Sequence, residues 1–150
     1  MMRRSSSAGM SYAEVLVVVA LTGALLLTAL PSLILPNQVP VASVARRVAA
    51  DLGLARRLAI AGRANYLVTF TPAGGGPFTA YSVAPQGGSP GQDFPKTFQS
   101  GLTVTATTSQ VTFLPSGAAS TAGTITIAQG TATALVQVTA ATGFIQVTGP

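Results

Sequence analysis

The chain has 150 residues, of which only 7% are charged, with a formal net charge of +5 and neither His nor Cys. These absences exclude Ser-His-Asp and Cys-His catalytic sites, thiolate or imidazole metal sites, and disulfide bonds. The length leaves room for one domain beyond a long N-terminal helix, and the basic balance, which owes much to a scarcity of acids, weakly favours an anionic partner.

The N-terminal part of the chain consists of a short basic segment and a long apolar one. Residues 1–9 are polar and include Arg3 and Arg4, whereas residues 15–35 contain no charge. About twenty helical residues, at roughly 1.5 Å each, cover the ~30 Å core of a bilayer. We therefore predict a membrane helix over residues 10–35, with Glu14 as its single carboxylate.

Three kinds of N-terminus compete for this pattern. A signal peptide fits poorly, because the apolar run exceeds the usual core of about 7–15 residues and leads into no clear cleavage site. A single-span anchor would keep the two arginines in the cytoplasm under the positive-inside rule. Cleavage between Gly9 and Met10 would instead leave the helix on the mature protein, with Glu14 as its fifth residue.

The stretch from Gly9 to Glu14, followed by the apolar run, resembles the N-terminus of type IV prepilins and pseudopilins, although Met10 stands where that family usually has Phe. The resemblance implies cleavage by prepilin peptidase after Gly9, methylation of the Met10 amino group, and pairing of Glu14 with the N-terminus of a neighbouring subunit. An ionisable residue in a membrane segment is costly and is a functional candidate for that reason. The alternative is a carboxylate at headgroup level that pairs with nothing.

Features within the apolar run favour contact with other helices and a change of direction. Small residues spaced by four would let a second helix approach closely. Proline removes a helix hydrogen bond, so we predict a kink or break between Pro31 and Pro40. The small residues are Ala20, Ala24, Thr28 and Ser32, with Gly23 beside them.

Residues 36–64 are predicted to continue the helix as an amphipathic segment that is helical from residue 41 to about Gly62, a plausible C-terminal stop. Apolar residues recur there at spacings of three and four, which predicts one buried face. Asp51 is interpreted as a surface or capping charge paired with Arg47 or Arg46. The predicted buried face comprises Val41, Val44, Val48, Leu52, Ala55 and Ala59, with Leu58 at its edge.

Five arginines lie away from the predicted buried face. Arg46 and Arg57 project from the opposite face, and Arg47, Arg56 and Arg63 flank it. The plain interpretation is a solvated face with some headgroup contacts. The alternative is an electropositive strip that contacts a phosphate backbone without sequence preference and weakens with salt. Against it, residues 147–150 have no basic residue, and residues 85–100 offer only Lys96.

Residues 65–150 are predicted to form a β-rich head. Alternating patterns predict one hairpin from residues 66–71 and 78–84, and a second from residues 102–106 and 110–114. Three further strands are expected at residues 124–128, 134–139 and 144–148. Residues 85–100 form a long loop of the kind that is either functional or disordered. About seven short strands behind one long helix indicate an α+β architecture with an antiparallel sheet.

No catalytic arrangement emerges from the polar residues of the head. Gly74-Gly75-Gly76 lacks the Lys-Ser/Thr that follows in a phosphate-binding loop and is interpreted as a turn. Asp93 lies in the long loop, and nothing indicates that it meets Asp51 as a paired-carboxylate site. We therefore predict that the protein is not an enzyme and uses neither a metal nor a cofactor.

Four segments of the second half, taken in order, resemble the GspH/FimT group of minor pseudopilins and minor pilins. They are ADLGLARRLAI at residues 50–60, VTFLPSG at 111–117, TITI at 124–127 and GFIQV at 143–147. Together with the N-terminus, the resemblance covers most of the chain. It implies a pilin-like fold and a structural role as a minor subunit of a type IV pilus or of a type II secretion pseudopilus.

The resemblance also implies partners and a location. Prepilin peptidase, other pilin or pseudopilin subunits and an inner-membrane assembly platform would be the partners, with a single helix in the inner membrane and an extracytoplasmic head. Some FimT-like minor pilins act in DNA uptake, which is a reason to consider DNA binding by the arginine strip. A further alternative is a membrane-anchored binding module that never polymerises and uses residues 85–100 as its contact surface.

Overall fold

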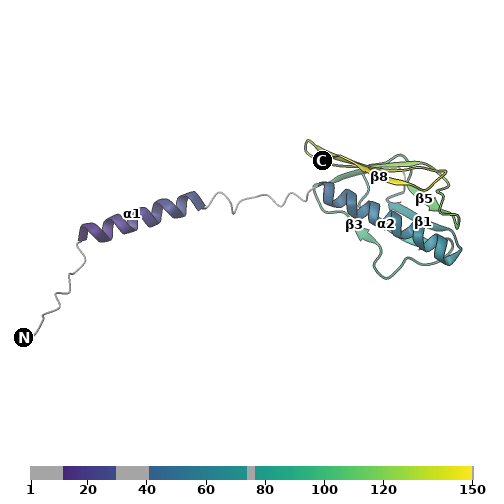
Figure 1. Ribbon diagram of the computed structural model, residues 1–150, viewed down its shortest axis with the longest axis horizontal. Coiled ribbons are helices and arrows are strands. Elements are labelled where there is room, and N and C mark those ends of the chain that lie inside the picture. The colour runs from purple at the N-terminus through teal and green to yellow at the C-terminus, as the bar shows by residue number, and fades with distance from the viewer. Residues whose placement is uncertain (1–11, 30–40, 74–76, 150) are drawn as a thin grey trace, which may run out of the picture. The chain divides into compact units, whose positions relative to one another are not determined.

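The structure is a computed structural model that describes residues 12–29, 41–73 and 77–149 (Figure 1). The chain divides into two compact units, Met1–Gln38 and Val39–Pro150. Among the described residues, the second unit contains one helix and all of the strands.

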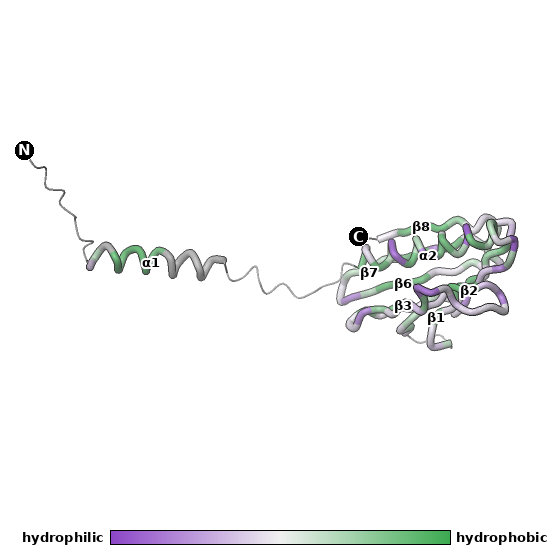
Figure 2. Tube along the Cα trace, turned by 90° about the horizontal axis from the view of Figure 1, so that it is seen from below, coloured by the Kyte–Doolittle hydropathy of each residue, from purple (hydrophilic) through white to green (hydrophobic). Residues whose placement is uncertain are grey.

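In the first unit, helix α1 spans Tyr12–Ala29 and consists mostly of Val, Leu and Ala. The described start of α1 is mostly apolar in Figure 2. Both ends of the predicted membrane helix, and the predicted break between Pro31 and Pro40, lie outside the described residues. Within the part of the chain that the structure describes, no helix is long and apolar enough to cross a membrane.

Helix α2 spans Val41–Gly62 and confirms the predicted end of the helix at Gly62. Arg63 follows with a φ of 47°, and the N–H of Ala64 donates to the carbonyl oxygen of Ala59 at 3.3 Å. This is the Schellman arrangement, in which a residue in the left-handed region lets the next N–H satisfy a carbonyl of the last turn. An arginine here occupies a position that glycine usually takes.

The buried face of α2 agrees with most of the predicted positions and adds two. Val44 is only half-buried, whereas Ala45 and Asp51, which were not assigned to this face, are buried. The face packs against strands of both sheets. Its buried residues are Val41, Ala45, Val48, Asp51, Leu52, Ala55 and Ala59.

The described residues of the second unit contain eight strands, β1 Tyr66–Thr71, β2 Ala80–Pro85, β3 Lys96–Thr97, β4 Thr103–Ala106, β5 Gln110–Phe113, β6 Gly123–Gln129, β7 Ala132–Val138 and β8 Ile145–Thr148. They form two antiparallel sheets of four strands, in the orders β3-β2-β1-β5 and β4-β6-β7-β8. The predicted α+β architecture is confirmed, with two sheets and one strand more than the seven expected.

The first predicted hairpin is confirmed, because β1 and β2 pair with Val68 opposite Val83. The second predicted hairpin is wrong: β4 pairs with β6, and β5 pairs with β1 in the other sheet. Alternation determines which side chains face the core, but it leaves the pairing partner open. Val104 and Val111 are both fully buried, yet they belong to different sheets.

The expectation for residues 85–100 also needs correction, because this segment contains β3. Lys96 and Thr97 pair with Tyr81 and Ala80, and the N–H of Phe98 donates to the carbonyl oxygen of Thr79 at 2.8 Å. The loop is thus tied to the edge of the first sheet. A two-residue strand carries too little pattern to be seen in the sequence.

The core of the second unit lies where α2 meets the two sheets. Leu52, Phe70, Phe113 and Ile127 are each 0% exposed. Burying a side chain of this size contributes about 1.5–3 kcal/mol. In Figure 1, α2 runs alongside the strands, and it contacts β1 of the first sheet as well as β7 and β8 of the second.

Candidate functional site

The residues predicted to act in processing and assembly belong to the first unit. Gly9, Met10 and Pro31 lie outside the described residues. Glu14 is in the first turn of α1, and Gly23, Ala24 and Thr28 follow within the same helix, but their side chains are not described. Ala20 is exposed. The roles of these residues stay predictions.

The described side chains of α1 form an apolar surface. Leu16, Val17 and Leu21 are 57%, 57% and 60% exposed. An apolar surface of this kind, continuous along a helix, marks a site that meets a partner or a membrane. Its residues are Val15, Leu16, Val17, Val18, Val19 and Leu21.

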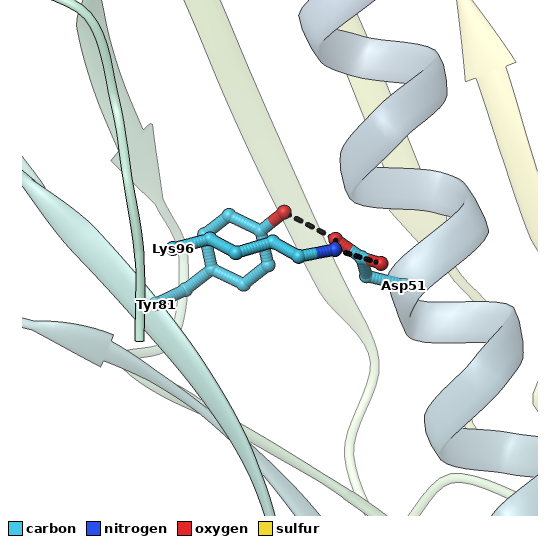
Figure 3. A network of polar contacts seen from close by, with 3 residues as sticks. All are labelled: Asp51, Tyr81 and Lys96. Carbon is cyan, nitrogen blue, oxygen red and sulfur yellow. Dashed lines mark hydrogen bonds and ion pairs between the residues drawn. The ribbon is translucent and has the colours of Figure 1, made fainter. Parts of the chain in front are cut away.

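In the second unit, a polar network joins α2 to the first sheet (Figure 3). The ammonium of Lys96 lies 2.7 Å from Oδ1 and 2.8 Å from Oδ2 of Asp51, and the Tyr81 hydroxyl donates to Oδ2. Asp51 is 7% exposed as a residue. A carboxylate so far from water requires a cation and hydrogen-bond donors, and here it has both.

The prediction that Asp51 is a surface or capping charge paired with Arg47 or Arg46 is wrong. Asp51 follows Val48 by three positions, so it faces the core with Val48 and Leu52. Its cation is Lys96, 45 residues further along the chain. The spacing alone could have placed Asp51 on the buried face, and a buried acid would then have required a distant basic residue.

Aromatic side chains surround this network. The Lys96 ammonium lies 4.9 Å from the centroid of the Phe94 ring, and the Tyr81 ring is 5.3 Å from that of Phe98 and 5.9 Å from that of Phe70. Burial, and next the hydrogen bond to Asp51, raise the pKa of Tyr81 well above its usual value of about 10. The phenol therefore stays protonated and acts as a donor.

The polar groups of this network are all paired. Among the described residues, every buried side-chain nitrogen or oxygen has a hydrogen-bond partner. The carboxylate accepts bonds from the Lys96 ammonium and from the Tyr81 phenol, whose raised pKa keeps it protonated at neutral pH. Such an arrangement holds α2, β2 and β3 together, and we assign it a structural role.

The five predicted arginines do not form one uniform strip. Arg46, Arg47 and Arg57 are exposed on α2, and Arg63 is exposed after its end. Arg56 is half-buried, and its Nε donates to the carbonyl oxygen of Gly117 at 2.8 Å. Arg56 thus contacts the protein itself, which leaves fewer cations for any outside partner.

The Gly117 carbonyl also contacts a second turn: the turn after β5, in the first sheet, meets the turn before β8, in the second sheet. Gly117 follows β5 with a φ of 83°, and Gly143 precedes β8 with a φ of 61°. A Cβ at position 143 would lie 2.1 Å from the Gly117 oxygen. Three of the four motifs noted in the sequence therefore meet at this point. Arg56 belongs to the motif at residues 50–60, and it contacts the glycines of the motifs at residues 111–117 and 143–147.

A family model described as "Type II transport protein GspH" matches residues 44–143. This range covers nearly all of α2 and strands β1 to β7, and it ends just before β8. A search of curated protein sequences gave no match.

Solved structures of two proteins share the fold. The minor pseudopilin EpsH from the type 2 secretion system of Vibrio cholerae aligns with a TM-score of 0.59 and 16% identity, covering 74% of this chain and 98% of EpsH. The type IV minor pilin FimU of Pseudomonas aeruginosa strain PAO1 aligns with a TM-score of 0.56 and 20% identity, covering 73% of this chain and 92% of FimU. Neither the family match nor these structures support nucleic-acid binding by the arginines.

Proposed function

The chain belongs to the GspH family of type II transport proteins, and from this membership we propose that it is a minor pilin or pseudopilin, a structural subunit of a type IV pilus or of a type II secretion pseudopilus. The observation that carries the proposal is α1, an apolar helix with exposed side chains that precedes a GspH-like domain in the sequence. A helix of this kind can serve as the element through which subunits polymerise.

The proposed life of the subunit begins in the inner membrane. Residues 1–9 are a leader that remains in the cytoplasm until prepilin peptidase cuts between Gly9 and Met10, and the Met10 amino group is then methylated. Residues 10–35 are the membrane and polymerisation helix, residues 36–64 continue it, and residues 65–150 are an extracytoplasmic head. An assembly platform in the inner membrane then transfers the subunit into the filament.

Glu14 is proposed to guide that transfer. In an apolar environment its carboxylate needs a positive partner, and the amino group of Met10 on a neighbouring subunit can supply one. Ala20, Gly23, Ala24 and Thr28 would let neighbouring helices approach closely, and Pro31 would bend the helix. No reaction is proposed, because the GspH family is a structural one and Asp51 is engaged with Lys96 and Tyr81.

The N-terminus of the mature protein tests the processing step. We expect Edman sequencing and mass spectrometry of the protein from its own membrane to give Met10, with the added mass of one methyl group. An intact Met1 would leave only an anchored module, and a cut near Ser32 would mean an exported head. Either result would refute filament assembly through α1.

The assembly role of Glu14 is tested by Glu14→Ala. We expect the variant to be processed at Gly9 but to be lost from sheared filaments, because the unpaired amino group of its neighbour costs a few kcal/mol in the membrane. Glu14→Asp, which keeps the charge, should retain part of the incorporation, and Tyr12→Phe should retain all of it. Equal incorporation of Glu14→Ala and the parent protein would contradict the role.

Cross-linking distinguishes the filament subunit from a membrane-anchored module that does not polymerise. A photoreactive residue at the exposed Val17 should link α1 to the N-terminal helices of other subunits. Linkage to lipid alone would favour the module. Residues 85–100, proposed as the contact surface of such a module, are tied to the first sheet through β3.

A further inference from the structure

The second unit has an apolar groove on its surface, between α2 and the start of β8. The groove has a volume of about 630 Å³. The two elements that form it are in direct contact and lie side by side in Figure 1. We call it the α2–β8 groove, and its lining consists of Ala49, Ala50, Gly53, Arg56, Arg57, Ile60, Phe144 and Ile145.

Its floor is shallow because small residues of α2 form it. A Cβ added at Gly53 would meet nothing within 4 Å, so this part of the helix surface is open. Ala49 and Gly53 are four positions apart and thus lie on one ridge of the helix. A partner's backbone or side chains can therefore approach α2 closely at this point.

Phe144 forms the wall and is held in position by its backbone. Its N–H donates to the Thr142 hydroxyl at 3.2 Å, and its carbonyl oxygen accepts from the N–H of Thr139 at 2.9 Å. Phe144 is nevertheless 57% exposed, and Ile60, which also lines the groove, is 46% exposed. An aromatic ring on a fixed backbone is well suited to anchor an interface, since little entropy is lost when it is covered.

The groove also has an uncompensated positive charge. Arg56 is committed to the Gly117 carbonyl, whereas Arg57 is exposed and makes no ion pair or hydrogen bond with another residue that the structure describes. Residues 39–150 contain six basic and two acidic side chains, a net charge of +4, and Asp51 is already bonded to Lys96. A unit of this charge favours an acidic partner.

We propose that the α2–β8 groove binds an apolar segment of a different subunit, and that this segment places an Asp or Glu opposite Arg57. The inference rests on the proposed function, which supplies the neighbouring subunits. The second unit of another copy is a poor occupant, because it would bring four further net positive charges and only Asp93 as an uncommitted acid. Juxtaposed like charges disfavour such a pairing.

Site-specific photocross-linking in the full-length protein tests the proposal. A photoreactive phenylalanine analogue replaces Phe144, filaments are irradiated in cells that assemble them, and mass spectrometry identifies the linked peptide. We expect an apolar peptide of another subunit that contains a carboxylate within about one helical turn of the linked residue. A peptide from this chain, or a linked peptide with no Asp or Glu, would overturn the proposal.

Charge reversal tests the part played by Arg57. Arg57→Glu should lower the cross-link yield at position 144 by roughly tenfold, because it places like charges together in a partly desolvated groove. Arg46→Glu is the matched control, since Arg46 is exposed on the same helix but does not line the groove. Equal losses in both variants would mean that only net charge matters and would overturn a specific contact at Arg57.

The same analogue at Val17 separates this proposal from the proposed function. Cross-links from position 17 but none from position 144 would leave a filament subunit whose groove is empty, and would overturn only the groove. Cross-links from neither position would overturn both. In the opposite case, links from position 144 alone would support a head that binds another subunit without polymerising through α1.

Discussion

At the scale of single residues, the carboxylate of Asp51 determines how α2 is joined to the first sheet. It lies inside an apolar face and is satisfied by Lys96 and Tyr81, which come from β3 and β2. A buried ion pair is weak evidence for stability, because desolvation opposes the attraction. Its clearer effect is to fix position: the three groups meet only when the edge of the first sheet is in place.

Tyr81→Phe should lower the free energy of unfolding by roughly 1–3 kcal/mol, because Asp51 would lose a hydrogen bond inside the protein. The pH dependence should change too. The raised pKa of Tyr81 means that the folded protein holds this proton more tightly than the unfolded chain. Stability from this group is therefore fully present below pH ~10 and falls as the pH rises above that value.

Urea unfolding of residues 39–150 between neutral pH and pH ~11 measures both effects. The matched control is Tyr66→Phe, which removes a phenol on β1 that makes no contact with Asp51 in the described network. The alkaline loss of stability should be smaller in Tyr81→Phe than in Tyr66→Phe. Parallel curves for the two variants would contradict the assignment to Tyr81.

At the scale of elements, the alternation of apolar residues predicts which side chains of a strand are buried, but it does not predict which strand is its neighbour. The alternating residues of β4 and β5 are buried as expected, but the two strands pair with β6 and β1. The chain between them crosses from one sheet to the other. The helix end was more predictable, because α2 ends at Gly62 and the closing turn through Arg63 and the Ala64 N–H involves only residues next to it in the chain.

Arg63→Gly should raise the free energy of unfolding by roughly 0.5–1 kcal/mol, because glycine adopts a positive φ without the strain that a Cβ imposes. Arg63→Ala is the control: it removes the same charge but keeps the Cβ at a φ of 47°. Thermal unfolding of the two variants gives the comparison. A gain in Arg63→Ala as large as in Arg63→Gly would assign the effect to charge instead of backbone conformation.

At the scale of the whole second unit, Arg56, Gly117 and Gly143 connect α2 to a turn of each sheet. The Arg56 Nε–H donates to the Gly117 oxygen, and the Gly143 backbone packs against the same carbonyl. This junction explains why glycines stand at the ends of two motifs far apart in the chain. It also supports one end of the α2–β8 groove, because Phe144 follows Gly143 directly.

Gly143→Ala should destabilise the protein by roughly 2–5 kcal/mol, because a strained φ and a clash with a backbone oxygen add together. Gly130→Ala is the matched control, since Gly130 has a similar φ of 57° but a Cβ there would meet nothing within 4 Å. It should cost only about 1–2 kcal/mol. Similar losses in both variants, measured by urea unfolding, would mean that the junction adds nothing.

The sequence by itself determined the features that depend on near neighbours in the chain. Periods of three to four and of two predicted α2 and most strands, Gly62 predicted the end of the helix, and the order of motifs identified the GspH group. Such features depend on the local backbone and on which face is apolar, and both can be read from adjacent residues.

Only the tertiary structure decided which distant groups meet. The partner of Asp51, the separation of β4 from β5, and the convergence of Gly117 and Gly143 on Arg56 all join residues far apart in sequence. A charge on a helix face has several candidate partners until the sheets are placed, and a strand has several candidate neighbours. The packing of α2 against both sheets selects among them, because it brings Asp51 within reach of Lys96 and Tyr81 and so pairs a buried polar group.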